Sequence, residues 1–403
     1  MKLELLFQRE DFYTIFNKTM EEYLYSTYSI KTTCSWKKIT MFTTIKDTFL
    51  VNEKLNIIYN SQISRDKLYD LTAEFAYNPS FIKNMLQKFY VNIATRILFE
   101  RIFSINLLKI SPILTDIKDW CIIPGNHTIR IIDLEKDYCV VILKKGFNKN
   151  FLLNEVNARQ KYDFLPTPKI IEVNKEKFFY KEERIVSLPL NRILDKKVKE
   201  DSLSFIQKEM LRLYNKTLVE IPIEKYLDKL SKNIRTVIKK LPDIYNNNDR
   251  EKLTVFYEQL LNKACKNKVE NISLVYSHGD FQPANLLVDM KNNSKKIDII
   301  DWEYSGEKFY LYDALVFASE CRMTFGLASR FNNMNKINKE IQWVQKVFLH
   351  KNQEIKDWHI SLFFLEDLYV RLDEVQIPTL KNKSESLIQF IKEVNKIQWQ
   401  NNE

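Results

Sequence analysis

The chain has 403 residues, of which 45% are hydrophobic and 28% are charged. This length and balance exclude a peptide hormone, a small disulfide-stapled protein and a largely disordered chain, and at about 150 residues per domain they suggest two or three structural units. The formal net charge is +10, but the first 120 residues carry 16 basic and 13 acidic side chains, so the positive excess is spread along the chain. A spread excess favours a solvated, lysine-rich surface, and we expect no nucleic-acid partner.

The cysteines and the hydropathy pattern predict a cytoplasmic protein without a membrane span. The five cysteines include no Cys-x-x-Cys pair and show no metal-ligand spacing, so we expect reduced, buried thiols in a reducing compartment. The abundance of lysine, asparagine and isoleucine hints at an AT-rich bacterial genome. The most apolar long window, residues 89–110, contains Arg96, Glu100 and Arg101, each of which would cost about 3 kcal/mol at the centre of a bilayer.

Residues 1–118 form the first predicted part of the chain. They combine short apolar stretches at 49–51 and 57–59 with helix-like segments at 64–77 and 80–103. These residues contain no motif with assignable chemistry. We expect a mixed or largely helical N-terminal extension of unknown role.

Residues 119–187 change to a period typical of β-strands. Apolar runs are separated by polar turns at 124–126, 135–137 and 174–176, and a helical segment ends before Pro166. The predicted strands are 121–123, 129–132, 138–143, 170–173 and 178–180, and the predicted helix is 149–162. The sequence therefore predicts a small antiparallel β lobe with one helix after its third strand.

Residues 188–403 read as a larger, helical lobe. Amphipathic segments cover 202–218, 223–240 and 251–266, a brief β episode lies between 274 and 301, and the remainder is mostly helical. The stretch 363–371 has apolar residues at helical spacing, which favours core packing, although Glu366 or Asp367 could line a substrate site. The predicted fold class is α+β.

The strongest chemical signal is the segment His278-Gly279-Asp280, followed by Asn285 and then by Ile300-Asp301-Trp302-Glu303. An antiparallel pairing of 286–289 with 297–300, in which paired positions sum to 586, would place Asn285 opposite Asp301. Amide and carboxylate oxygens are hard ligands of the kind that Mg²⁺ prefers. Asp280, five residues before Asn285, can face the same point and accept a hydroxyl proton.

These motifs resemble the aminoglycoside phosphotransferase and choline kinase group of the protein-kinase-like superfamily, whose large lobe carries His-Gly-Asp-x-x-x-x-Asn and then Ile-Asp-Trp-Glu. The resemblance implies a bilobal protein-kinase-like fold with Asp280 as catalytic base and with Asn285 and Asp301 as Mg²⁺ ligands. It also implies that His278 braces the catalytic loop. Asp313, twelve residues after Asp301, matches an acid that supports this loop.

A second match lies in the predicted β lobe. Val141-Ile142-Leu143-Lys144 resembles the strand whose lysine grips the α- and β-phosphates, with Glu155, eleven residues later, as its ion-pair partner. Lys145 points to the opposite face of the strand, and spacing and context favour Lys144. The turn Gly125-Asn126-His127 occupies the place of the phosphate-covering loop, although it has a single glycine.

Together the motifs and the resemblance predict Mg²⁺-dependent transfer of the γ-phosphate of ATP to a hydroxyl of a small molecule. An aminoglycoside, a choline-like amine, a sugar and a polysaccharide precursor all fit as acceptor, and no motif identifies the acceptor-binding residues. A non-catalytic nucleotide-binding scaffold is one alternative, but Asp280, Asn285 and Asp301 are all present. A protein kinase is the other, and the sequence has neither His-Arg-Asp, Asp-Phe-Gly nor Ala-Pro-Glu.

Overall fold

A computed structural model describes residues 3–40, 42–72, 75, 77, 80–96, 99–242, 245–266, 269–289, 296–348, 355–376 and 383–399. The chain divides into two compact units. Unit 1 comprises Met1–Asn157, Pro166–Leu203 and Leu286–Ile300, and unit 2 comprises Ala158–Leu165, Ser204–Asn285 and Asp301–Glu403. Each is described by itself below.

Unit 1 is built on a nine-stranded sheet in the order β1-β4-β2-β3-β5-β6-β7-β9-β8. All neighbouring strands pair antiparallel. The strands are β1 (Thr33–Lys38), β2 (Phe49–Asn52), β3 (Ile57–Asn60), β4 (Asn106–Ser111), β5 (Trp120–Pro124), β6 (Thr128–Asp133), β7 (Tyr138–Leu143), β8 (Ile170–Asn174) and β9 (Phe179–Glu183). The five predicted strands of residues 119–187 are present, and β1–β4 of the N-terminal region extend the same sheet.

Helices cover both faces of the inner strands, which explains why every residue of β2 and β3 is buried. The helices of unit 1 are α1 (Leu3–Arg9), α2 (Phe12–Tyr28), α3 (Arg65–Thr72), α4 (Phe81–Ala94), α5 (Glu100–Phe103) and η2 (Thr115–Ile117), and α6 (Asn150–Lys161) begins in it. α1 and α2 share one hydrophobic cluster with Val140 and Ile142 of β7. Cys139 and Val141 pack on α6 instead, because successive side chains of a strand face opposite sides.

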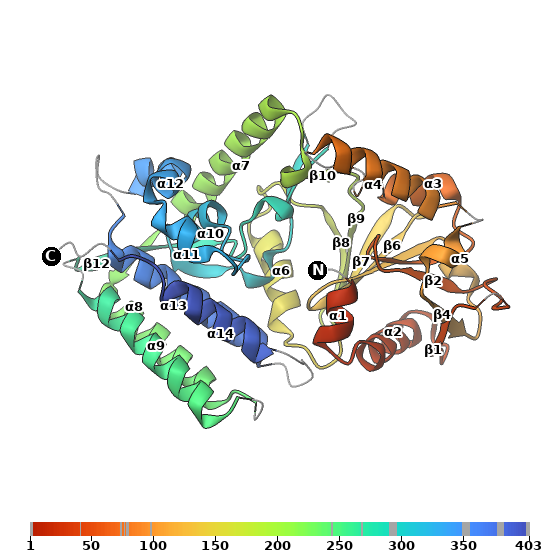
Figure 1. The fold of residues 1–403 in the computed structure, drawn as a ribbon, viewed down its shortest axis with the longest axis horizontal. Helices are drawn as coiled ribbons and strands as arrows, with labels where there is room; N and C mark the ends of the chain where they lie inside the picture. The colour runs from red at the N-terminus through yellow and green to blue at the C-terminus, as the bar shows by residue number, and fades with distance from the viewer. Residues whose placement is uncertain are drawn as a thin grey trace. The chain divides into compact units, whose positions relative to one another are not determined.

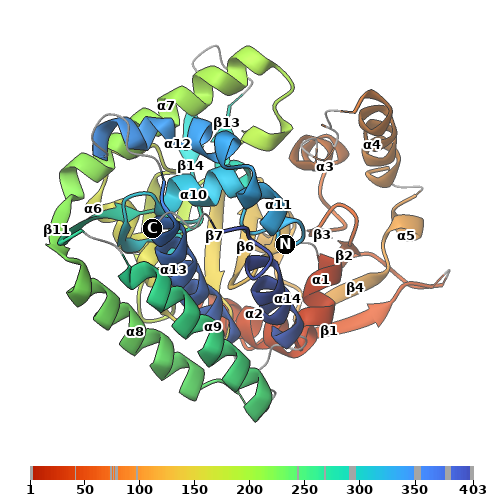
Figure 2. The same cartoon turned by 60° about the vertical axis from the view of Figure 1, so that its left-hand side comes forward.

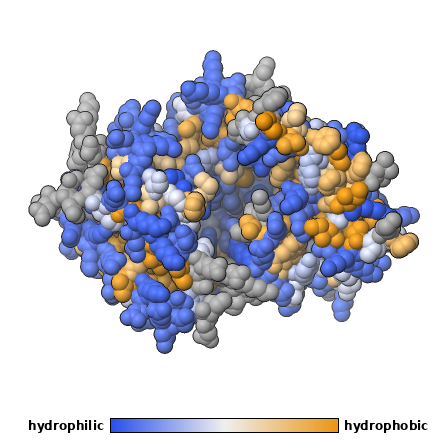
Figure 3. Space-filling model, in the orientation of Figure 1, coloured by the Kyte–Doolittle hydropathy of each residue, from blue (hydrophilic) through white to orange (hydrophobic). Residues whose placement is uncertain are grey.

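On β2 and β3, α3 and α4 lie on the face opposite to α1 and α2 (Figure 1). The single helix predicted over 80–103 is wrong, since α4 ends at Ala94 and α5 begins at Glu100. Thr95 closes α4 by donating its N–H to the carbonyls of Val91 and Ile93, which tightens the last turn. Apolar surface gathers over α4 (Figure 3), where Ile82 and Phe89 are 65% and 66% exposed.

Two short sheets carry the segments that flank the His278 and Asp301 motifs. In unit 1, β10 (Leu188–Pro189), β13 (Leu286–Val288) and β14 (Ile297–Ile299) form one sheet, near η3 (Leu190–Arg192). In unit 2, β11 (Val219–Pro222), β12 (Asn271–Ser277) and β15 (Gly306–Phe309) form the other.

Helices make up most of unit 2, as predicted. They are α7 (Lys196–Thr217), which starts in unit 1, α8 (Ile223–Lys239), α9 (Asn247–Cys265), η4 (Pro283–Asn285), η5 (Trp302–Tyr304), α10 (Tyr312–Ser319), α11 (Leu327–Asn332), α12 (Met334–Phe348), α13 (Asp357–Val375) and α14 (Lys383–Val394). α13 packs against α8 and α9 (Figure 2). The large antiparallel sheet of unit 1 and the mostly helical unit 2 confirm the predicted α+β class.

Two further observations concern the cysteines and the membrane. All five cysteines are free, and four are buried as expected. The expectation is wrong for Cys265, which is exposed in the last turn of α9. Within the parts of the chain that the structure describes, no helix combines the length and apolarity needed to cross a membrane.

Candidate active site

The loop after β12 is pressed against the segment that contains Asp301. Gly279 has φ +85°, and a Cβ at this position would lie 2.0 Å from the carbonyl oxygen of Tyr304. Only glycine therefore fits. This close approach brings the His278-Gly279-Asp280 motif and the Asp301-Trp302-Glu303 motif together in unit 2, and the ring of His278 lies 4.6 Å from that of Trp302.

Asp313 of α10 holds the backbone of this loop. Its Oδ2 accepts hydrogen bonds from the backbone N–H of His278 at 2.7 Å and from the hydroxyl of Tyr214 at 2.9 Å. Its Oδ1 accepts from the N–H of Gly279 at 2.9 Å. Burial raises the pKa of Asp313, although these donors oppose the shift. His278 also fixes the backbone of Asp280, two residues later, because its Nδ1 accepts from the N–H of Asp280 at 3.2 Å.

Three side-chain donors surround the carboxylate of Asp280. Its Oδ2 accepts from Gln282 Nε2 at 2.8 Å and from Asn285 Nδ2 at 3.1 Å. Its Oδ1 accepts from Arg322 Nε at 2.6 Å. Because each of these partners donates, the arrangement suits an ionised carboxylate. Asp280 and Asn285, which the sequence analysis expected to face the same point, are in direct contact.

The predicted hairpin register is wrong by one residue. β13 and β14 pair Leu287 with Asp298 and Leu286 with Ile299, so paired positions sum to 585. The N–H of Asp289 donates to Lys296 O at 2.9 Å and fixes this register at the turn. β14 ends at Ile299, and Asp301 lies outside the ladder with φ 73° and ψ 52°. Asp301 therefore has a left-handed backbone conformation and takes no part in the strand pairing.

Arg322 is the residue of this site that sequence reasoning missed. Besides Asp280, its guanidinium donates to Asp367 Oδ1 at 2.9 Å and to Gly279 O at 2.8 Å. Burial opposes its charge, but Asp280 and Asp367 raise the pKa of Arg322. Arg322 does not belong to any of the sequence motifs. The one indication of such a contact in the sequence was the pair of acids at 366–367 in an apolar predicted helix. Asp367 is fully buried in α13, in agreement with the core packing expected for this stretch, and it also contacts Arg322.

A second guanidinium completes the network. Arg371 donates to Asp367 Oδ2 at 2.7 Å and to Cys321 O at 2.7 Å. Burial acts to raise the pKa of Asp367, but the charges of Arg371 and Arg322 outweigh it and hold this pKa below its usual value. The neighbouring Glu366 accepts from Tyr226 and, at 2.9 Å, from the N–H of Phe309.

The residues predicted to hold the nucleotide lie together in unit 1. Gly125, Asn126 and His127 connect β5 and β6, and Lys144 follows β7. The N–H of Lys144 donates to His127 O at 2.9 Å, and its Nζ donates to Asn126 O at 3.4 Å. The ring of His127 stacks on that of Phe151 with centroids 3.8 Å apart. Because the imidazole of His127 is buried, the groups of this turn that remain for a nucleotide are the backbone and the side chain of Asn126.

The partner of Lys144 comes from an unexpected place. Its Nζ lies 2.5 Å from Oε1 of Glu10, and both side chains are almost fully buried. Glu155 is buried on α6, and its pairing with Lys144 stays a prediction. The side chain of Lys145 is 55% exposed and pairs with Glu22 at 2.6 Å, so the two neighbouring lysines have different carboxylate partners.

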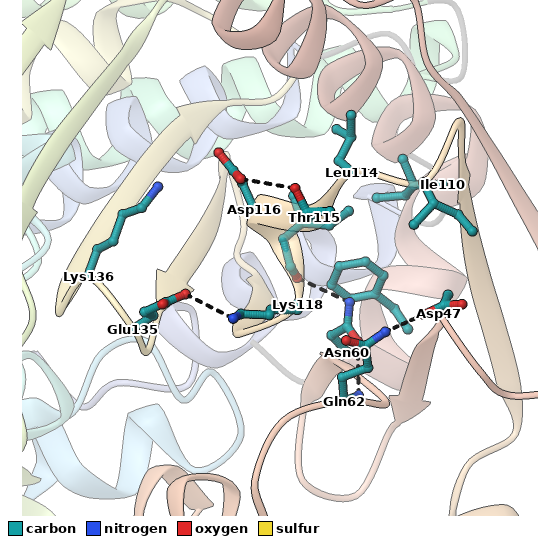
Figure 4. A pocket seen from close by; sticks show the side chains of 13 residues that line it. Asp47, Asn60, Gln62, Ile110, Leu114, Thr115, Asp116, Lys118, Glu135 and Lys136 are labelled. Atoms are coloured by element: carbon teal, nitrogen blue, oxygen red, sulfur yellow. Dashed lines mark hydrogen bonds and ion pairs between the residues drawn. The ribbon is translucent and has the colours of Figure 1, made fainter.

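A pocket elsewhere in unit 1 takes no part in this chemistry. It has a volume of about 570 Å³ and is lined by residues of β2, β3, η2 and the turn after β6. Its polar side chains engage one another, as in the pairs of Gln62 with Asp47 and Lys118 with Glu135 (Figure 4). None of the predicted site residues lines it.

Comparison with known proteins identifies a family through its family model, whereas the search of curated proteins finds no match. The choline/ethanolamine kinase family model matches residues 189–402, which include the His278 and Asp301 motifs.

Several solved structures resemble the chain weakly. Choline kinase LicA from Streptococcus pneumoniae is 13% identical, with 68% of this chain and 89% of that chain covered and a TM-score of 0.45. An ethanolamine kinase from Plasmodium vivax is 12% identical, with 85% and 98% covered and a TM-score of 0.42. A GDP complex of aminoglycoside 2'-phosphotransferase-IIIa is 12% identical, with 68% and 91% covered and a TM-score of 0.44. At these identities the likeness says nothing about the acceptor of this chain.

The predicted resemblance is confirmed by the family model, which spans just over half of the sequence. The chain belongs to the choline/ethanolamine kinase family and is a small-molecule kinase of the α+β, protein-kinase-like class.

Proposed function

We propose that this kinase transfers the γ-phosphate of ATP, with Mg²⁺, to the hydroxyl of a small acceptor. The observation that carries the proposal is the contact of Asp280 with Asn285 in a loop that Gly279 presses against the Asp301 segment. We infer that a carboxylate for the hydroxyl proton and oxygen ligands for a cation share one site. Family membership disfavours the scaffold and protein-kinase alternatives.

Asp280 is the proposed catalytic base. It would orient the acceptor hydroxyl and take its proton on a carboxylate oxygen as the phosphoryl group is transferred. Phosphoryl transfer demands positioning more than covalent chemistry, and Asp280 is held by side-chain donors on both of its oxygens. His278 and Asp313 are proposed as supports, because their hydrogen bonds fix the backbone on which Asp280 stands.

Asn285 and Asp301 are the proposed Mg²⁺ ligands, and their surroundings fit a hard cation. Asn285 donates through Nδ2 to the backbone oxygen and Oδ2 of Asp280, which leaves its carboxamide oxygen as the ligand atom. Asp301 has a left-handed backbone conformation at φ 73°, which Asp and Asn adopt more readily than most residues. Two protein ligands are enough for Mg²⁺, which takes its remaining ligands from phosphates and water and neutralises phosphate charge when bound.

Lys144 is proposed to bind the α- and β-phosphates, beside the turn formed by Gly125, Asn126 and His127 and with Glu155 on the neighbouring helix. The contacts of Lys144 with this turn support the assignment. The acceptor screen begins with choline and ethanolamine because of the family description and extends to aminoglycosides and sugars. The proposed place of action is the cytoplasm.

The test compares wild type with Asp280→Asn. The variant is nearly isosteric but cannot take a proton, so ATP binding by calorimetry should be preserved while turnover on the accepted substrate falls by about 10²-fold or more. Asp228→Asn, an exposed position on α8, is the matched control and should keep wild-type turnover. Equal turnover in wild type and Asp280→Asn would refute Asp280 as the base.

A further inference from the structure

Two consecutive residues of the N-terminal region reach both elements that are proposed to contact the nucleotide phosphates. Arg9, the last residue of α1, donates from Nη1 to Asn126 Oδ1 at 2.8 Å. Glu10 accepts from Lys144 Nζ at 2.5 Å. The first contact holds the turn between β5 and β6, and the second holds the lysine. Residues 134 positions apart in the chain therefore share one buried ion pair.

The burial of this pair distinguishes it from ordinary surface pairs. The side chains of Lys144 and Glu10 are 1% and 0% exposed. A buried ammonium keeps its charge and its place only beside a counter-charge. The neighbouring pair of Lys145 and Glu22 also joins the N-terminal region to the end of β7, but its side chains are 55% and 62% exposed. Such an exposed pair contributes little.

The N-terminal segment is anchored in the core and is not a loose arm. Leu3 and Leu6 of α1 are fully buried in the same cluster as Val140 and Ile142 of β7. The backbone N–H of Leu3 also donates to Asn56 Oδ1 at 2.6 Å. Segments that open to admit a ligand come from the weakly packed parts of a structure. The packing of α1 instead favours a permanent part of the site.

The second carboxylate oxygen of Glu10 supports a functional role. Oε2 is buried and has no hydrogen-bond partner among the residues that the structure describes. Native structures rarely leave a buried acceptor without a donor, and those that do call for a functional or ligand-linked explanation.

We propose that Glu10 is a positioning residue of the nucleotide site, which holds Lys144 charged and aimed at the phosphates, and that Arg9 holds the adjacent turn. The inference rests on the proposed function of Lys144 as phosphate ligand. It makes the N-terminal region a working part of the kinase, although residues 1–118 lie outside the family match at 189–402.

The test is a double-mutant cycle in the full chain, read as the affinity for ATP with Mg²⁺ by calorimetry. Glu10→Gln should weaken binding at least about tenfold, because Lys144 loses the carboxylate charge that lies 2.5 Å from its Nζ, and the effect should disappear in a Lys144→Met background. The double variant removes both charges of the Glu10–Lys144 pair and should fold even where Glu10→Gln alone does not. Glu22→Gln is the matched control and should bind within about twofold of wild type.

The outcomes separate the inference from the proposed function. Equal weakening by Glu10→Gln with and without Lys144 would mean a purely structural role and would overturn the inference. Tighter binding by Glu10→Gln would also overturn it, since Glu10 would then compete with the phosphates. Wild-type protein that binds no nucleotide would overturn the proposed function and the inference together.

Discussion

Arg322→Met tests whether the arginine beside Asp280 serves catalysis as well as stability. Methionine keeps the apolar stem of the side chain but removes the guanidinium, and with it the bonds to Asp280, Asp367 and Gly279 at 2.6, 2.9 and 2.8 Å. Arg322 has a side-chain exposure of 18% and Asp367 of 0%. The perturbation therefore acts inside the protein, where ionic contacts are strong.

The expected loss follows from the partners that remain. Hydrogen bonds to charged groups contribute about 1.5–3 kcal/mol each, and breaking a buried ion pair costs about 3–5 kcal/mol. Asp367 keeps Arg371 at 2.7 Å, and Asp280 keeps Gln282 and Asn285. We therefore expect the free energy of unfolding to fall by about 3 kcal/mol and not by the sum of three bonds.

Turnover should fall as well, because small misplacements of a catalytic group cost about 10²-fold. We expect the kcat of Arg322→Met to drop at least about tenfold at saturating nucleotide, with Arg322→Lys intermediate. The assays are urea unfolding and steady-state transfer to the accepted substrate. Arg212→Met removes a half-exposed pair with Glu209 and should change neither. A destabilised Arg322→Met with kcat within about twofold of wild type would refute the positioning role, and unchanged stability would refute the ion pair.

Three further predictions concern single side chains. Asp301→Asn, which still tolerates φ 73°, should lower Mg²⁺-dependent turnover by about 10²-fold or more in a transfer assay, and full activity would remove Asp301 from the metal site. Lys144→Ala should lower transfer strongly whereas Lys145→Ala should have little effect, and the reverse order in a nucleotide-dependent rate assay would move the phosphate contact by one residue. Burial raises the pKa of Glu366 to about 7, above its unfolded value of about 4.3, so the folded state binds the extra proton and stability falls as pH rises from about 4.3 to 7. Glu366→Gln cannot titrate and should flatten this fall by up to about 3 kcal/mol in urea unfolding between about pH 5 and pH 7.5, whereas an unchanged slope would contradict the assignment.

Local patterns in the sequence were enough to predict much of the fold. The alternation of apolar and polar residues placed β5 to β9 and α6 within a few residues of their bounds, because period 2 and period 3.6 report directly on which side chains are buried. The motif spacing likewise selected Asp280 and Asn285, which touch at 3.1 Å. A loop of a few residues allows few backbone conformations, so the spacing of two residues within it already indicates that their side chains can meet.

Tertiary structure alone decided the contacts between distant residues. Glu10 pairs with Lys144 and Arg322 with Asp280 across 134 and 42 positions, and no periodicity or motif connects these positions. All three residues of β14 are buried, so no exposed face marks its register against β13, although a slip of one residue exchanges the faces of the strand. β1 to β4 joined the main sheet through pairing with β5, since a strand's partner is chosen by packing of the whole core and not by its own residues.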